Sequence, residues 1–124
     1  MIHPYALIGM QYRLGANPST HNAADCLSLA KAVLEWQGIQ TPPAQRSWYR
    51  RLRRGDNKVF SEELERWGQK IETPKIGTVA LCQSELGLGM ASYFEDGWLH
   101  FEESAVKWSP IDVLPVIAYY CPMK

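Results

Sequence analysis

The spacing of apolar residues changes at Pro74, and this change constrains the fold more than any other feature of the chain. Before Pro74, apolar side chains recur at helical spacing in three stretches, residues 22–38, 44–54 and 62–69. After Pro74, short β-prone segments follow, mostly with alternating apolar residues, at residues 76–82, 90–94, 98–102, 106–108 and 116–120. Between the second and third of these, Glu95-Asp96-Gly97 is a hairpin signal. Helices followed by antiparallel strands predict an α+β fold, with the helix over 22–38 packed on a C-terminal antiparallel sheet.

The length and charge of the chain narrow its possible partners. At 124 residues, the chain is predicted to be a single domain over 1–124, with a helical insertion at about 44–70. Lys plus Arg and Asp plus Glu are both 13, so no overall field favours nucleic acid. Five arginines do cluster in the second helical stretch, which predicts a solvated face or one that docks on a partner: Arg46, Arg50, Arg51, Arg53 and Arg54.

The cysteines and the apolar runs argue against a metal site and a membrane span. Cys26, Cys82 and Cys121 are widely spaced, without a Cys-x-x-Cys pair or histidines at zinc-ligand spacing. We therefore expect no metal and no cofactor. A Cys82–Cys121 disulfide stays open as an alternative, although reduced thiols are favoured. No apolar run approaches the ~20 residues that cross a bilayer, and the N-terminus lacks a signal pattern.

The stretch 22–38 predicts a helix with a cysteine in its first turn. Asn22 or Thr20 is the expected N-cap and Gly38 the C-terminal stop. Leu27, Ala30 and Leu34 fall on one face, so Cys26 should lie at the edge of the core. Helix N–H groups and the helix dipole stabilise a thiolate there, which suits a nucleophile. The alternative is a buried structural thiol, because free cysteine is among the most buried residue types.

Two side chains precede Cys26 closely enough to be its neighbours. Tyr12 and His21 lie in a segment of Gly, Asn-Pro and Ser that leads into the helix. Tyr12 is a candidate donor beside the thiol or an aromatic at the edge of the core. His21 is a candidate base or an exposed loop histidine.

Three stretches of the chain, residues 8–18, 25–26 and 89–93, resemble in this order the motifs of the NlpC-type cell-wall cysteine peptidases, which have a papain-like α+β fold. Residues 8–18, with Tyr12, are similar to the segment that opens that family, and Asp25-Cys26 to its Asp-Cys helix start. Gly89-Met90-Ala91-Ser92-Tyr93 is similar to its His-Val-Gly-Ile-Tyr strand, with Gly89 in place of the histidine. The resemblance implies that Cys26 is the nucleophile and Tyr12 lies beside it. It also implies that His100 is the residue that orients the base, and that the base itself is missing.

The resemblance extends to the small NlpC-type proteins encoded among bacteriophage tail genes. It implies a virion tail protein, made in the bacterial host cytoplasm, whose partners are other tail proteins. The domain is then a degenerate peptidase kept for tail structure or assembly. The alternative is an active endopeptidase that cuts the peptidoglycan stem peptide with Cys26 and a substitute base, His100 or His21. An amidase, acyltransferase or toxin-immunity role on the same scaffold has no residue in its favour beyond Cys26.

Overall fold

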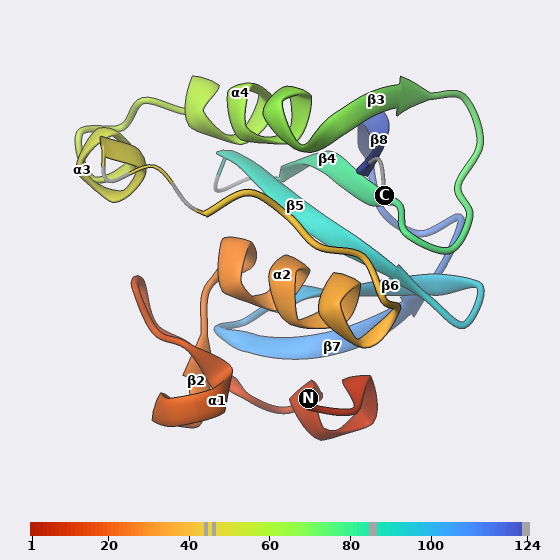
Figure 1. The fold of residues 1–124 in the computed structure, drawn as a ribbon, viewed down its shortest axis with the longest axis horizontal. Coiled ribbons are helices and arrows are strands. Elements are labelled where there is room, and N and C mark those ends of the chain that lie inside the picture. Colours follow the sequence, from red (N-terminus) through yellow and green to blue (C-terminus); the bar gives the residue numbers. More distant parts are fainter. Residues whose placement is uncertain (44, 46, 85–86, 123–124) are drawn as a thin grey trace.

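Helices occupy the first half of the chain in the computed structural model, which describes residues 1–43, 45, 47–84 and 87–122 (Figure 1). The helices are η1 (Pro4–Leu7, a 3₁₀ helix), α1 (Pro18–His21), α2 (Cys26–Trp36), α3 (Ser47–Arg53) and α4 (Lys58–Trp67). The prediction of an α+β fold is confirmed. The part of the second predicted helix at residues 44 and 46 lies outside the described residues.

The strands of the described chain form one sheet in the order β2-β1-β7-β6-β5-β4-β8-β3. Neighbouring strands are antiparallel except β1 and β2, which are parallel. The antiparallel sheet predicted after Pro74 is confirmed by β4 to β8, whereas β1 to β3 were not predicted. The strands are β1 (Gln11–Tyr12), β2 (Ala23–Ala24), β3 (Gly68–Ile71), β4 (Val79–Ser84), β5 (Gly87–Phe94), β6 (Gly97–Glu102), β7 (Ala105–Pro110) and β8 (Val116–Pro122).

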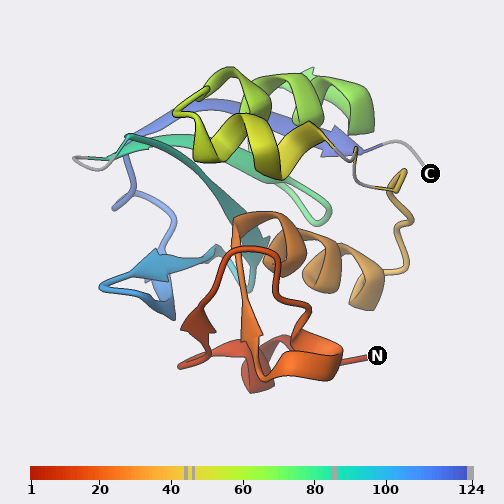
Figure 2. The same cartoon turned by 90° about the vertical axis from the view of Figure 1, so that its left-hand side faces the viewer.

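Helix α2 packs on the sheet and divides the core on that face into two parts (Figure 1). Leu27 and Leu34 join side chains from α3, α4, β4 and β5, while Leu29 and Val33 join η1, β6 and β7. These leucines and Val33 are at most 1% exposed, so the predicted packing of the cysteine helix is confirmed. Figure 2 shows α3 and α4 over one end of the sheet and α2 beneath them.

The opposite face of the sheet is covered by the segment between β7 and β8. Trp98 of β6 is fully buried there with Ala80 and Ala91, and its indole N–H donates to the carbonyl of Ile111 at 3.0 Å. Ile111 and Leu114 pack against this cluster. Successive side chains along β4 and β5 point to opposite faces of the sheet, so each strand contributes to the core under α2 and to the cluster around Trp98.

The predicted Asp-Gly hairpin joins β5 to β6. Glu95 and Asp96 have φ of 50° and 55°, the pair of left-handed residues that a type I′ turn needs. At Gly97, a Cβ would lie 2.3 Å from a ring carbon of Trp108, so only glycine fits. The sequence signal and the close approach of the indole ring both favour this turn.

Two helix starts differ from the prediction. Asp25 is the N-cap of α2, not Asn22 or Thr20, because Ala23 and Ala24 are extended in β2 and pair with β1. Helix α4 begins at Lys58, so the polar residue Ser61, which directly precedes the predicted stretch 62–69, lies within the helix and is not its N-cap. Both errors arise because the chain offers several polar residues near each start, and tertiary pairing selects among them.

All three cysteines are free thiols, as the favoured alternative predicted. Cys82 of β4 is opposite Val116 of β8, whereas Cys121 is opposite Gln69 of β3, so Cys82 and Cys121 are not bonded. In the described segments, no helix has both the length and the apolar character that a bilayer span needs.

Candidate functional site

A cavity of about 340 Å³ lies where strands β5 and β6 separate. They pair only from Ser92 to Phe94 and from Gly97 to Leu99. In the part of each strand that lies further from the hairpin, β5 stays paired with β4, and β6 stays paired with β7. The start of β5 and the end of β6 therefore diverge, and the cavity lies between them. Its lining includes Tyr12, Cys26, Cys82, Gly89 and His100.

Cys26 is the first residue of α2 and reaches this cavity from the helix side. The Asp25 carboxylate caps the helix, and the N–H of Ser28 donates to it at 2.8 Å. Burial raises the pKa of the Cys26 thiol to about 11, and the charge of Asp25 adds to this rise. Hydrogen bonds from the backbone of Met90 and of Cys26 itself act in the opposite direction but are outweighed. The thiol is therefore almost wholly protonated near neutral pH.

This high pKa predicts slow alkylation of Cys26. At pH 8 a thiol with a pKa of about 11 is about 100-fold less ionised than one with the ordinary value of 9.0. In a Cys82→Ser/Cys121→Ser background, iodoacetamide should label the folded protein about 100-fold more slowly than the same protein in urea. Mass spectrometry of timed samples gives both rates. Equal rates would show that the fold does not suppress the thiolate.

Tyr12 comes to the cavity because β1 pairs with β2. Tyr12 is opposite Ala24, two residues before Cys26, and its ring lies edge-on to that of Phe101 at 5.1 Å between centroids. Burial, followed by the nearby Cys26 and Asp25, raises the pKa of its hydroxyl to about 12. The hydroxyl therefore stays protonated and is available as a hydrogen-bond donor near the thiol.

His100 lines the cavity from β6 and is 8% exposed. Its Nε2 lies 2.7 Å from the Oγ of Ser109 on β7. Burial lowers the pKa of the imidazole, and the neighbouring Lys107 adds to this, while Phe101 and Glu102 oppose it. His100 is therefore a neutral imidazole at pH 7, held to β7 by Ser109.

The lowered pKa of His100 predicts a loss of stability as pH falls below about 6.5. The unfolded chain protonates this histidine first and so binds more protons than the folded chain, which favours unfolding. The loss continues until pH passes the lower folded pKa. Urea unfolding of wild type and of His100→Gln between pH 7.5 and pH 5 should show a shallower decline in the variant. Gln40→Ala, at an exposed position without a titratable side chain, is the control and should keep the wild-type slope.

Gly89 lies on the β5 side of the cavity, directly opposite Cys82 of β4. A Cβ built at Gly89 would meet no atom within 4 Å, and its φ is not in the left-handed region. Neither backbone conformation nor space explains the glycine at this position. Cys82 faces the same side of the sheet, and burial raises the pKa of its thiol to about 12.

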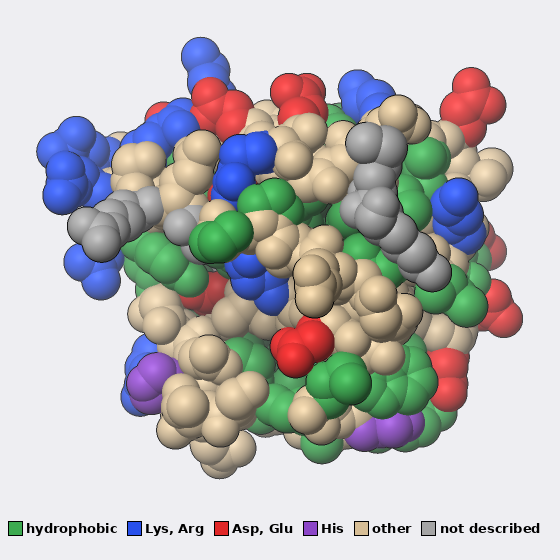
Figure 3. Space-filling model, in the orientation of Figure 1, with side chains coloured by type: hydrophobic (Ala, Val, Ile, Leu, Met, Phe, Trp, Pro, Cys, Tyr) green, Lys and Arg blue, Asp and Glu red, His purple; other side chains and the backbone are tan. Residues whose placement is uncertain are grey.

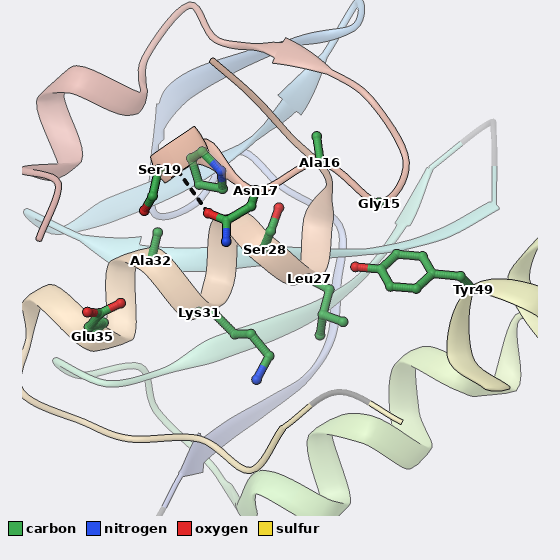
Figure 4. Close-up of a pocket in the computed structure, with 11 residues that line it drawn as sticks. Gly15, Ala16, Asn17, Ser19, Leu27, Ser28, Lys31, Ala32, Glu35 and Tyr49 are labelled. Atoms are coloured by element: carbon green, nitrogen blue, oxygen red, sulfur yellow. Dashed lines mark hydrogen bonds between the residues drawn. The ribbon is translucent and has the colours of Figure 1, made fainter. Parts of the chain in front are cut away.

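Asp25 links the cysteine helix to two other segments. Its second carboxylate oxygen accepts from the N–H of Gly15 at 2.8 Å, and burial together with the nearby Asp25 carboxylate raises the pKa of the Tyr49 hydroxyl. Figure 4 shows the Tyr49 hydroxyl pointing toward the first turn of α2, beside a second cavity of about 350 Å³. Asp25 is 1% exposed, so these contacts fix the start of α2 and with it the position of Cys26.

The structure thus brings together Cys26, Tyr12 and His100, and it leaves His21 apart. The Nδ1 of His21 accepts from the N–H of Asn17 at 2.8 Å, and His21 is exposed and does not line the cavity. Sequence reasoning missed Cys82 and Tyr49. The strand register would have placed Cys82 opposite Gly89, but no signal in the sequence indicates that Tyr49 reaches Asp25. In the described part of the chain, no group of three or more His, Cys, Asp or Glu could hold a metal ion.

Comparison of the sequence with known proteins adds no assignment. No protein-family model matches the chain, and no curated protein matches it significantly. The functional argument therefore rests on the geometry of the cavity and on the motif similarity of the sequence.

Proposed function

We propose that the chain is a catalytically inactive NlpC-like domain that serves as a structural or assembly component of a bacteriophage tail or tail tip. The arrangement of Cys26, Tyr12 and His100 around one cavity supports the peptidase-like part of this proposal. The similarity of residues 8–18, of Asp25-Cys26 and of 89–93 to NlpC-type motifs supports the same part. The tail role extends that resemblance, by analogy, to the small NlpC-type proteins encoded among bacteriophage tail genes.

The observation that carries the inactive state is Gly89. A cysteine peptidase needs a base that takes the thiol proton and returns it to the leaving amine. Gly89 supplies no such group at the cavity, and burial, which raises the pKa of the Cys26 thiol to about 11, keeps the proton on its sulfur. The Nε2 of His100 lies 2.7 Å from the Oγ of Ser109, so this nitrogen already has a hydrogen-bond partner.

The test of inactivity is turnover of purified peptidoglycan, read by chromatography and mass spectrometry of the released muropeptides. Wild type and Cys26→Ala should both release no stem-peptide fragments, at concentrations where each is folded. Fragments released by wild type and absent with Cys26→Ala would overturn the inactive state. A known endopeptidase acting on the same preparation is the control for the substrate.

The test of the tail role is the content of purified virions from a phage that encodes the chain. The protein should remain with intact tails through density purification, at a constant ratio to the major tail protein. Loss of the protein during purification, with infectivity unchanged when its gene is deleted, would overturn this part of the proposal.

The second candidate is an active endopeptidase in which His100 replaces the missing base. It is favoured by one observation, that His100 and Cys26 line the same cavity and His100 is neutral at pH 7. In this reaction the Cys26 sulfur would attack the amide carbonyl as its proton passes to the imidazole, which then protonates the leaving amine. Activity that is lost with both Cys26→Ala and His100→Ala would select this candidate.

A further inference from the structure

An acidic aromatic hollow lies at one end of the molecule, around the β5–β6 hairpin. The cavity measures about 440 Å³, and we call it the acidic aromatic end. Two carboxylates line this cavity, and no lysine or arginine does. Its lining includes Trp36, Ile76, Tyr93, Phe94, Glu95 and Asp96. Ile76 is 70% exposed and Trp36 39%, so apolar surface is open to a partner.

Both carboxylates of this end are held in place by tyrosines. The Tyr5 hydroxyl donates to Glu95, and the Tyr93 hydroxyl donates to Asp96 at 2.7 Å. The ring of Phe94 lies edge-on to those of Tyr5 and Trp36, at 5.3 and 5.9 Å between centroids. The hollow therefore presents fixed negative charge beside aromatic rings.

The opposite end carries the complementary group. Arg50, Arg53 and Arg54, at and just after α3, are exposed, and we call these three residues the basic end. In the described part of the chain none of the three has an ion pair, whereas Arg51 is paired with Asp56 and Glu62. Figure 3 shows Lys and Arg side chains gathered on the side where α3 lies.

The two ends cannot meet within one molecule. Figure 1 has the longest axis horizontal, with α3 at its left extreme and the β5–β6 hairpin at its right. The formal net charge of the whole chain is zero, so these ends are a separation of charge within a neutral protein.

We infer that copies of this chain associate head to tail, with the basic end of one copy bound at the acidic aromatic end of the next. A guanidinium group fits the hollow better than other cations, because it stacks on aromatic faces and binds carboxylates through paired N–H groups. The chain itself supplies three unpaired guanidinium groups at the far end, which is why the occupant is a second copy. Such a contact between two different surfaces produces open chains or closed rings.

This association does not depend on whether the cavity beside Cys26 is catalytic. The residues that it uses are Ile76 and side chains of η1, of the hairpin, of the C-terminal turn of α2 and of the region of α3. Peptidoglycan turnover therefore tests the proposed function, while the oligomeric state tests this inference.

The experiment is sedimentation velocity of the wild-type chain from roughly micromolar to millimolar concentration, at about 50 mM and about 500 mM NaCl. At low salt the weight-average mass should rise with concentration, and high salt should return the monomer. Two neutralising variants, Arg53→Gln/Arg54→Gln and Glu95→Gln/Asp96→Asn, should each raise the dissociation constant by about tenfold or more. Both acidic replacements keep an oxygen that accepts the tyrosine hydroxyls.

A mixture of the two variants distinguishes head-to-tail contact from a symmetric one. Each variant keeps the end that the other lacks, so an equimolar mixture should form one-to-one complexes with wild-type affinity and nothing larger. Lys70→Gln and Glu72→Gln, at exposed positions on and beside β3, are matched controls and should associate like wild type.

Three results would overturn the inference. The wild type could stay a monomer at low salt across the whole concentration range, or the mixture could fail to form the two-chain complex. A monomer that binds a labelled DNA oligonucleotide through Arg53 and Arg54 would assign the basic end to an anionic polymer instead.

Discussion

Gly89→His is expected to raise the alkylation rate of Cys26 at pH 7 by about 100-fold, because a nearby imidazolium lowers a thiol pKa by about one to three units. Gly89 lines the same cavity as Cys26, and a Cβ at this position meets no atom within 4 Å. The first carbon of a new side chain therefore has space here, and we expect the imidazole to extend into the cavity. Iodoacetamide labelling in the Cys82→Ser/Cys121→Ser background measures the rate.

The same variant should also release stem-peptide fragments from peptidoglycan, since it supplies the base that the proposed inactive domain lacks. Gly89→Ala is the matched control, because it adds the Cβ but no base, and it should keep the slow wild-type alkylation. Cys26→Ser combined with Gly89→His should abolish any turnover. If folded Gly89→His alkylates as slowly as Gly89→Ala, the side chain at this position does not reach the thiol.

Asp25→Ala is expected to lower the free energy of unfolding by about 3 kcal/mol, as the sum of a lost helix cap and a buried donor left unpaired. Asp25 is 1% exposed, and the N–H groups of Ser28 and Gly15 both donate to it at 2.8 Å. The alanine accepts neither. Equilibrium urea unfolding, with the slope compared between variants, measures the change.

Two further variants separate the parts of this effect. Tyr49→Phe keeps the ring and removes only its hydroxyl, so it should cost about 1 kcal/mol. Asp112→Ala, at an exposed position, should change stability by no more than about 0.5 kcal/mol. An Asp25→Ala protein as stable as Asp112→Ala would show that the cap does not hold the start of α2.

The sequence predicted the elements whose signals are local. Alternating residues and Asp96-Gly97 identified the β5–β6 hairpin, and the apolar face of 22–38 identified the packing of α2. Strands β1 and β2 have two residues each, and their pairing depends on contacts between Tyr12 and Ala24, twelve positions apart in sequence. No periodicity can develop in two residues, so these strands could not be predicted.

The candidate site was predicted in part for a similar reason. Tyr12, Cys26 and His100 were named from motif similarity, and they do line one cavity. Tyr49 lies near Asp25 although it is 24 residues further along the chain, and only the packing of α3 against α2 brings it there. Residues whose role depends on such packing carry no mark in the local sequence.

The cavity beside Cys26 is made by the branching of the sheet, where β5 follows β4 and β6 follows β7. It depends on backbone hydrogen bonds more than on the side chains that line it. A chain of this shape could exchange residues of its cavity, for example at Gly89 where a Cβ has space, and still keep a hollow of the same form. The shape of the cavity and any reaction in it are therefore separate properties of this protein. A chain of this fold without a catalytic base would still have a cavity that could bind a ligand.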